Sequence, residues 1–408
     1  MTREKIYLFD TTLRDGQQTP GIDFSVEDKI SIAAMLDEFG LDYVEGGYPG
    51  ANPTDTAFFA KRRTQKASFV AFGMTKRAGI SASNDPGLSQ LIQSKADAVC
   101  LVAKSWDYHV KVALGCTNEE NLESIRDSVK AVVEAGKLAM VDCEHFFDGY
   151  KANPTYALAC AKTAYDAGAR WVVLCDTNGG TQPPEIRDII AAVIASGIPG
   201  SSLGIHAHND TGQAVANSLA AVETGVRQIQ GTLNGIGERC GNADLVTIIP
   251  TLCLKDSYSS RFETSIDRDA LVGLSPNHQS PYVGGSAFAT KAGIHASALL
   301  KDPKTYEHVE PESVGNFRKV MVSDQGGKAN FINELKRRGI RVEKDDPKLD
   351  TLISIVKERE ASGYAYEGAD ASFELLAQRT LTSVPDFFQV ESFRVMIERR
   401  FDSHGRLK

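Results

Sequence analysis

Eight short apolar runs, rich in β-branched residues, recur through the first part of the chain, with helical patterns between them. The runs span 6–10, 42–47, 68–73, 98–103, 138–144, 171–176, 203–208 and 228–233. Near-continuous apolar runs are typical of strands that are buried on both faces of a parallel sheet. The sequence therefore predicts an α/β fold with eight parallel strands.

The helical stretches carry their own start and stop signals. Ser25 with Asp28, and Thr117 with Glu120, form the Ser/Thr-x-x-acid pattern of a capping box. Glycines at 136, 168, 197 and 225 close four stretches at steps of roughly 30 residues, the length of one βα unit. Eight such units over about 250 residues predict a TIM (β/α)8 barrel. The alternative is an open doubly wound sheet, but no strand is followed by the GxGxxG turn of a Rossmann sheet.

After about residue 255 the pattern changes. Residues 275–308 are rich in Gly, Ser, Pro and His, whereas 332–339 and 349–360 have helical, charged patterns. The stretch 387–401 alternates apolar and polar residues like a strand. We predict a barrel domain over 1–270, a linker contributing to the functional site over 271–310 and a mainly helical subdomain over 311–385. Residues 386–408 are expected to begin a truncated C-terminal regulatory domain.

Charge and cysteine content narrow the class of function. The 45 Lys and Arg residues against 53 Asp and Glu residues give a net charge of −8, which argues against bulk binding to nucleic acid or anionic membranes. No apolar run approaches the ~18 residues of a membrane span, and the N-terminus lacks the apolar core of a signal peptide. Seven scattered Cys residues without a CxxC motif indicate reduced thiols, a cytoplasmic location and no zinc finger.

Polar residues gather at the carboxyl ends of the predicted strands, where barrel enzymes carry their chemistry. His206 and His208 are two residues apart on one strand, so their imidazoles point to the same side. A lone His-x-His pair is weak evidence for a metal, but Asp15 and Asn242 lie at neighbouring strand ends. These nitrogen and oxygen donors predict a site for a divalent ion such as Mn²⁺, Mg²⁺ or Zn²⁺.

Three further residues near these strand ends are candidates for a catalytic role. Arg14, beside Asp15, is a candidate cation for stabilising a developing oxyanion. Glu144 is a candidate acid or base, or a group that orients substrate. Cys240 has no evident His partner in the sequence, so we interpret it as a small buried thiol.

Four long motifs now show a resemblance to a known family. FDTTLRDGQQTPG (9–21), GIHAHND (204–210), GTLNGIGERCGNADL (231–245) and TKAGIHASALL (290–300) resemble the acyl-CoA-dependent Claisen synthases of 2-oxoacids. This family comprises the isopropylmalate, homocitrate and citramalate synthases, and it belongs to a metal-dependent TIM-barrel group named for an Asp-Arg-Glu site. The segment 42–59 is most similar to the citramalate synthase branch.

The resemblance implies a role for each matching residue. It implies that Arg14 contacts the 2-oxo oxygen, that Thr177 binds the oxoacid carboxylate and that Glu144 is catalytic. Its implied metal ligands are Asp15, His206, His208 and Asn242. His295 and Tyr306 match a catalytic pair that in the family reaches into the neighbouring subunit's barrel, so a homodimer with shared active sites is expected. Family members usually carry a C-terminal domain that binds an end-product amino acid, so this chain is expected to be insensitive to isoleucine.

The expected reaction is condensation of acetyl-CoA with pyruvate and water to give (R)-citramalate and CoA, as a step of isoleucine biosynthesis. Either Glu144 or His295 could be the base that deprotonates acetyl-CoA, and the sequence leaves this choice open. The alternatives are an isopropylmalate or homocitrate synthase with a larger 2-oxoacid, a lyase on the same barrel, or a non-catalytic metabolite sensor. The presence of both Arg14 and Glu144 argues against a sensor.

Overall fold

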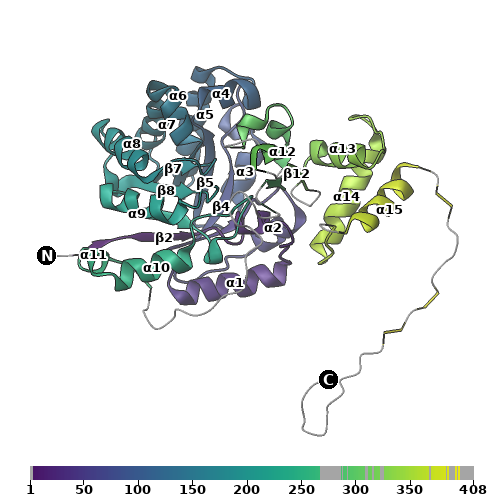
Figure 1. Cartoon of the computed structure of the whole chain (residues 1–408), viewed down its shortest axis with the longest axis horizontal. Helices are drawn as coiled ribbons and strands as arrows, with labels where there is room; N and C mark the ends of the chain where they lie inside the picture. Colours follow the sequence, from purple (N-terminus) through teal and green to yellow (C-terminus); the bar gives the residue numbers. More distant parts are fainter. Residues whose placement is uncertain are drawn as a thin grey trace, which may run out of the picture.

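Eight parallel strands close into a barrel, as predicted (Figure 1). The structure is a computed structural model that describes residues 3–266, 286, 288–291, 293–307, 311–314, 317–321, 326–366, 369–382, 384–385, 391–392 and 394–395. The barrel strands are β2 (Tyr7–Asp10), β3 (Tyr43–Gly47), β4 (Ser68–Met74), β5 (Ala98–Lys104), β6 (Leu138–Glu144), β7 (Trp171–Asp176), β8 (Leu203–Ala207) and β9 (Gln228–Gly231). Strand β9 pairs with both β8 and β2, which excludes the open doubly wound sheet.

Helices surround the barrel and connect its strands (Figure 1). They are α1 (Val26–Phe39), α2 (Pro53–Phe58), α3 (Pro86–Gln93), α4 (Asp107–His109), α5 (Asn118–Glu134), α6 (Phe146–Ala152), α7 (Pro154–Asp166), α8 (Pro183–Ala195), α9 (Ala214–Thr224), α10 (Leu245–Leu254) and α11 (Asp256–Ser259). Both predicted capping boxes are present, at Ser25 and Thr117. Gly40 ends α1 with φ 96°, a left-handed conformation that glycine adopts without strain.

The amino-terminal half of the barrel interior is closed by large side chains. Phe9, Tyr43, Met140 and Trp171 are all buried there, and the indole Nε1 of Trp171 donates to the hydroxyl of Tyr43 at 3.0 Å. Packing of this kind makes the barrel interior a core and not a channel. The polar strand ends therefore face only the carboxyl-terminal mouth.

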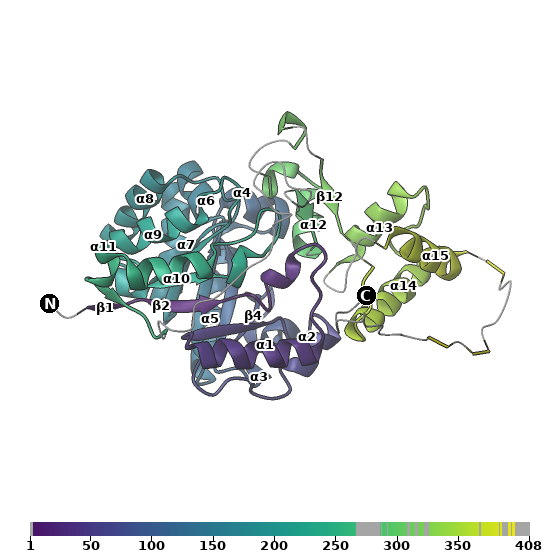
Figure 2. The same cartoon turned by 60° about the horizontal axis from the view of Figure 1, so that its bottom comes forward.

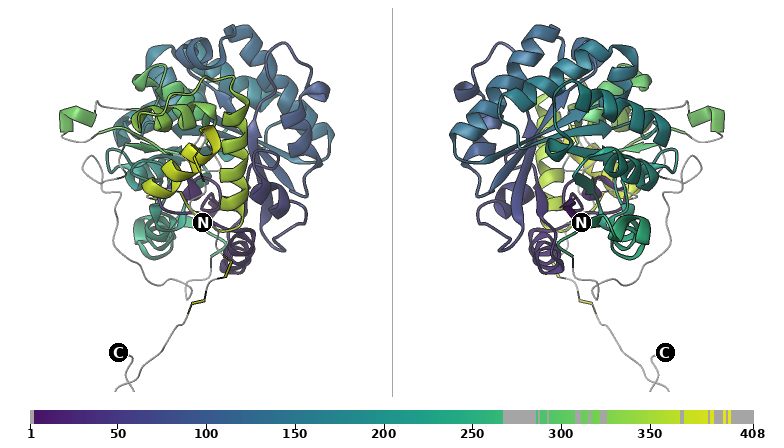
Figure 3. Two further views of the ribbon diagram at one scale, coloured as in Figure 1. Left: turned by 90° about the vertical axis from the view of Figure 1, so that its right-hand side faces the viewer. Right: turned by 90° about the vertical axis from the view of Figure 1, so that its left-hand side faces the viewer.

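A second group of helices lies beyond that mouth (Figures 2 and 3). Helix α12 (Gly293–Leu299) packs near the rim, and α13 (Lys328–Arg337), α14 (Pro347–Ala361) and α15 (Asp370–Leu381) form a small bundle with its own apolar core. Two short parallel pairs join β1 (Glu4–Lys5) to β10 (Phe262–Glu263) and β11 (Ala289–Thr290) to β12 (Lys319–Val320). Most of the strand predicted at 387–401 lies outside the described residues.

No helix in the described part of the chain is both long and apolar enough to cross a membrane. All seven cysteines are described, and none of them forms a disulfide. Cys240 is buried, in agreement with its interpretation as a small core thiol.

Candidate active site

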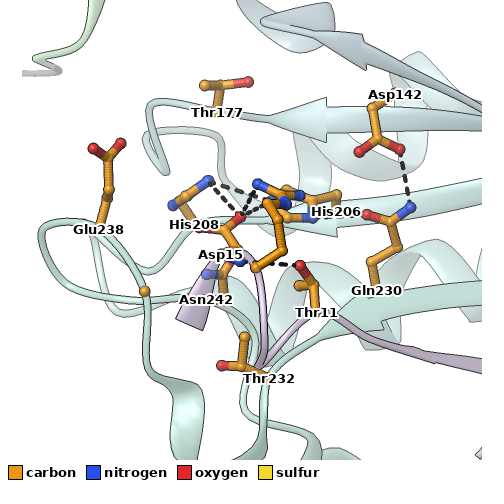
Figure 4. A network of polar contacts seen from close by, with 12 residues as sticks. Thr11, Asp15, Asp142, Thr177, His206, His208, Gln230, Thr232, Glu238 and Asn242 are labelled. Atoms are coloured by element: carbon orange, nitrogen blue, oxygen red, sulfur yellow. Dashed lines mark hydrogen bonds and ion pairs between the residues drawn. The ribbon is translucent and has the colours of Figure 1, made fainter. Parts of the chain in front are cut away.

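Asp15, His206 and His208 converge at the barrel mouth. The Nε2 atoms of the two imidazoles lie 3.3 Å apart, and Oδ2 of Asp15 lies 3.3 Å from Nε2 of His206 and 4.0 Å from Nε2 of His208 (Figure 4). His206 on β8 and His208 directly after β8 project to the same side, as the two-residue spacing predicts. Two imidazole nitrogens and a carboxylate oxygen around one point can hold a divalent cation.

Asn242 joins this group from the loop after β9. A backbone bridge sets it against His208, and Figure 4 places its side chain beside Asp15. Its Nδ2 donates to the carbonyl of Ile236 at 3.2 Å, so its Oδ1 faces the other way. Among the described residues, Oδ1 of Asn242 and Oδ1 of Asp15 are buried without a hydrogen-bond partner. Buried acceptors without donors are costly, and a bound cation would satisfy them, so the donor set fits a metal ion.

A chain of hydrogen bonds fixes the tautomer of His206 (Figure 4). Nε2 of Gln230 donates to Asp142 at 2.9 Å, which turns Oε1 of Gln230 toward Nδ1 of His206, also at 2.9 Å. Nδ1 must therefore carry a hydrogen, and the lone pair of Nε2 faces Asp15. Burial opposes a charged imidazole, but the carboxylates of Asp15 and Asp142 together outweigh burial and raise the pKa of His206.

Arg14 is held between two carboxylates. Its Nε donates to Oε2 of Glu45 at 2.8 Å, and its NH1 lies 3.2 Å from Oδ2 of Asp15. The guanidinium carbon lies 3.8 Å from the centre of the Phe72 ring. Burial opposes its charge, but Glu45 and Asp15 together hold the pKa of Arg14 above its ordinary value. Arg14 is thus a fixed cation beside the cluster, with its side chain 11% exposed.

Glu144, at the end of β6, forms a second buried cluster. Its carboxylate pairs with Nζ of Lys104 and accepts a hydrogen bond from the hydroxyl of Tyr306 at 2.9 Å. Nε2 of His295 lies 3.8 Å from Oε1 of Glu144, and the ring of His295 stacks on that of Tyr306 with centroids 4.4 Å apart. Burial alone would raise the pKa of Glu144, but Lys104 and the histidines around it together outweigh burial and hold that pKa well below its ordinary value.

His295 and Tyr306 lie at the mouth of their own barrel in the single chain, which does not test the expected contact between subunits. We expected this pair to enter the barrel of a neighbouring subunit. In the structure both side chains close the mouth of their own barrel, because suitable partners lie there: Nδ1 of His295 bonds to Glu238, and Tyr306 bonds to Glu144. The arrangement in an oligomer remains a prediction.

Thr177 lies at the end of β7, on the wall of the same mouth. Its Oγ1 accepts a hydrogen bond from the backbone N–H of His145 at 2.8 Å. His145 has φ 57°, an uncommon value for a residue with a side chain. Because Oγ1 already accepts from His145, the hydroxyl hydrogen of Thr177 can donate into the cavity.

One cavity of about 610 Å³ connects these groups. Its floor includes Arg14, Asp15, Glu144, His206 and His208. Its outer part is lined by four lysines from the helical region: Lys301, Lys328, Lys344 and Lys357. The volume is in the range of small-molecule sites. Of the nine site residues that the sequence predicts, all but Asn242 and Tyr306 line this cavity. Tyr306 bonds to Glu144, and Asn242 is bridged to His208, and both of these partners line the cavity.

Sequence reasoning missed several residues that support this site. Lys104 is not among the site residues that the sequence predicts. Its place at the end of the apolar run AVCLVAK (98–104) could have indicated a polar group at a strand end. Gln230 supports His206 from a neighbouring strand, and only the three-dimensional structure reveals that partner. Glu238 stands among the polar residues after the last predicted strand, but its contact with His295 is likewise visible only in three dimensions.

A closed parallel barrel with a histidine–carboxylate cluster and a buried acid–base group at its mouth defines the class of metal-dependent α/β-barrel enzymes. The chain belongs to the HMGL-like family, which matches residues 5–275. Residues 282–362 match the homocitrate synthase post-HMGL domain-like family. These matches confirm the resemblance inferred from the sequence.

Individual relatives show which members of this family the chain resembles. The (R)-citramalate synthase of Aquifex aeolicus (strain VF5) is 47% identical over 98% of this chain and 78% of the relative. The 2-isopropylmalate synthase of Sulfolobus acidocaldarius is 33% identical over 90% of this chain and 94% of the relative. The HMG-CoA lyase structure from Brucella melitensis has a TM-score of 0.56 at 22% identity, covering 66% of this chain and 95% of the lyase. That likeness shows the fold alone.

Proposed function

We propose that this enzyme condenses acetyl-CoA with pyruvate and water to give (R)-citramalate and CoA. The observation that carries the proposal is one cavity that joins three groups. They are the Asp15–His206–His208 cluster, called the metal-type cluster below, the fixed Arg14 and the Glu144–His295 pair. A Claisen condensation needs these three functions: an activated carbonyl, a charge to stabilise its oxygen, and a base for the acetyl methyl group. Identity of 47% to an (R)-citramalate synthase supports pyruvate as the acceptor.

The oxoacid would bind over the metal-type cluster. Asp15, His206, His208 and Asn242 would hold a divalent ion, for which Mn²⁺, Mg²⁺ and Zn²⁺ all suit the donor set. Such an ion supplies Lewis acidity that makes the 2-oxo carbon more electrophilic. The Arg14 guanidinium stabilises the alkoxide that develops on the 2-oxo oxygen as the carbon–carbon bond forms. The Thr177 hydroxyl donates to the oxoacid carboxylate.

His295 is the better placed of the two candidate bases. Its Nδ1 bonds to the carboxylate of Glu238, so Nδ1 carries the hydrogen and Nε2 offers a lone pair. Glu144 is instead occupied by Lys104 and Tyr306. His295 therefore removes the methyl proton, and the nearby Glu144 carboxylate stabilises the imidazolium that results. The methyl carbanion adds to the 2-oxo carbon, the C=O π electrons become the alkoxide, and the alkoxide takes up a proton to give the hydroxyl of citramalyl-CoA. Water then hydrolyses the citramalyl-CoA thioester and releases CoA.

The outer cavity suits the nucleotide end of acetyl-CoA. Lys301, Lys328, Lys344 and Lys357 bring four ammonium groups to one opening on a chain whose net charge is −8. Cations gathered at one opening attract phosphate groups. The thioester would then reach inward to His295.

The test is release of the CoA thiol from acetyl-CoA with pyruvate. We expect rapid release that stops with a chelator, returns when a divalent metal is added back, and is absent in Glu144→Gln. Thiol release that is independent of pyruvate would contradict the proposal, because simple thioester hydrolysis would then explain the activity.

A larger 2-oxoacid is the nearest alternative acceptor, because the chain is also 33% identical to a 2-isopropylmalate synthase, although the 47% identity to an (R)-citramalate synthase favours pyruvate. Pockets of this kind distinguish 2-oxoacids of different size through few side chains, and one methylene changes the binding free energy by about 1–3 kcal/mol. Comparison of acceptor 2-oxoacids decides between the two.

We also propose that the enzyme works as a cytoplasmic homodimer in isoleucine biosynthesis. Seven cysteines, none of which forms a disulfide, support a reducing compartment. Mixing Glu144→Gln and His295→Ala chains tests the shared site. If His295 serves the neighbouring barrel, hybrid dimers regain up to about a quarter of wild-type activity, because half of the dimers are hybrids with one intact site each. No recovery after confirmed exchange would show that each chain completes its own site.

A further inference from the structure

Lys104 is a buried cation at the base of the site to which the sequence motifs assign no role. It is the last residue of β5 and lies opposite Glu144 in the register of β5 and β6. Only 2% of its surface is exposed, and it contributes to the wall of the main cavity. A lysine is almost never buried to this extent unless it is paired.

The contacts of Lys104 form a closed triangle with two proposed catalytic residues. Its Nζ pairs with Oε2 of Glu144 and donates to the hydroxyl of Tyr306 at 3.3 Å. The Tyr306 hydroxyl in turn donates to Oε1 of Glu144 at 2.9 Å. Each carboxylate oxygen therefore has its own donor, which fixes the plane of the carboxylate as well as its charge.

The other groups that face Glu144 cannot replace this cation. They are His109 on α4, His145 beside Glu144 itself, His295 on α12 and Tyr306 after α12. Burial lowers the pKa of His109 to about 2 and also lowers the pKa of His145, so both imidazoles are neutral near pH 7. A buried carboxylate that loses its only permanent cation takes up a proton.

We infer that Lys104 is a positioning residue that holds Glu144 as an oriented carboxylate, with Oε1 toward Tyr306 and His295. This role rests on the proposed function, because it matters only where Glu144 must stabilise a charge on His295. An ionised Glu144 provides that stabilisation, whereas a neutral carboxylic acid does not. Lys104 acts through Glu144 and need not touch the substrate.

The simpler hypothesis is that the Lys104–Glu144 pair is purely structural. The two roles differ in what replacement of the lysine does. A structural pair would change stability alone, whereas a positioning lysine also sets the protonation state of Glu144 and the pH range of activity.

The first experiment is independent of the reaction. Infrared difference spectra at pH 7 should show a protonated carboxylic acid band in Lys104→Met that is absent in wild type and in Lys104→Met/Glu144→Gln. Lys104→Arg should lack the band. Because no substrate is present, failure of the proposed function leaves this outcome unaffected. A spectrum of Lys104→Met without the band would overturn the inference.

The second experiment measures the pH profile. In Lys104→Met, kcat should fall about 100-fold, with a smaller change in KM for pyruvate and an acid limb of kcat/KM moved to higher pH. Lys104→Arg should recover most of the rate. Lys76→Met is the matched control, since Lys76 is buried and paired with Glu123 and Asp127 outside the cavity. If Lys104→Met does not fold, Lys104→Gln replaces it. If the acid limb of the folded variant lies at the same pH as that of wild type, the Lys104–Glu144 pair is purely structural and the positioning role is refuted.

Discussion

Tyr306 donates its hydroxyl hydrogen to Oε1 of Glu144 across 2.9 Å, although 162 residues separate the two in the sequence. This bond ties the segment after the barrel to the end of β6. It also fixes where His295 stands, because the rings of His295 and Tyr306 are stacked with an interplanar angle of 30°. The barrel alone therefore supplies the metal-type cluster, and the segment that follows it supplies the proposed base.

Tyr306→Phe tests the importance of that bond. Loss of the hydroxyl should lower kcat about 100-fold, because Glu144 loses one of its two donors. The ring remains to stack on His295, so the melting temperature should change by only a few degrees. Steady-state kinetics and thermal unfolding measure the two effects. An unchanged kcat would remove Tyr306 from the mechanism.

Asp15→Asn should remove metal binding. In the wild-type enzyme, Mn²⁺ at about 100 times its Kd should stabilise the fold by ~2.7 kcal/mol. The variant should show no metal-dependent rise in melting temperature, because the cluster loses its only carboxylate. Asp37→Asn is the control: Asp37 accepts three backbone N–H bonds outside the cavity, so its loss should lower stability but preserve the metal effect. An equal response to Mn²⁺ in Asp15→Asn would contradict the assignment.

Buried His109 predicts a pH dependence of stability. Burial lowers its pKa to about 2, whereas an unfolded chain binds that proton below pH ~6.5. The unfolded state thus takes up protons that the folded state does not, and the free energy of unfolding falls as pH drops below ~6.5. The loss per histidine is about 1.4 kcal/mol per pH unit.

His109→Phe should make this slope shallower by about one proton, while wild type and variant should run parallel above pH 7. Urea unfolding of the metal-free protein between pH 4.5 and 8 measures both curves. Identical slopes below pH 6 would show that His109 is protonated in the folded state.

The lysines of the outer cavity should affect the binding of acetyl-CoA and not that of pyruvate. Lys301→Ala/Lys344→Ala should raise KM for acetyl-CoA about tenfold and leave kcat nearly unchanged, because phosphate contacts are the same in ground and transition states. Lys348→Ala is the control, since Lys348 bonds to the carbonyl of Leu381 and does not line the cavity. An equal KM change for pyruvate would argue against a nucleotide site.

The sequence predicts those parts of the structure that local pattern determines. Apolar runs and capping boxes locate the strands and helices, and the His206-x-His208 spacing places both imidazoles on one side. The Lys104–Glu144 pair depends instead on the register of β5 and β6, and the support of His206 by Gln230 depends on that of β8 and β9. Register follows from how the whole barrel closes, so no local motif reports it.

The most direct test of the account offers the enzyme isotopically labelled acetyl-CoA with equal concentrations of pyruvate, 2-oxobutyrate and 2-oxoisovalerate. Products are then separated by chiral chromatography and identified by mass. The account predicts labelled (R)-citramalate as the dominant product, and none from Glu144→Gln. Labelled 2-isopropylmalate as the dominant product, or no condensation at all in metal-loaded enzyme, would contradict it.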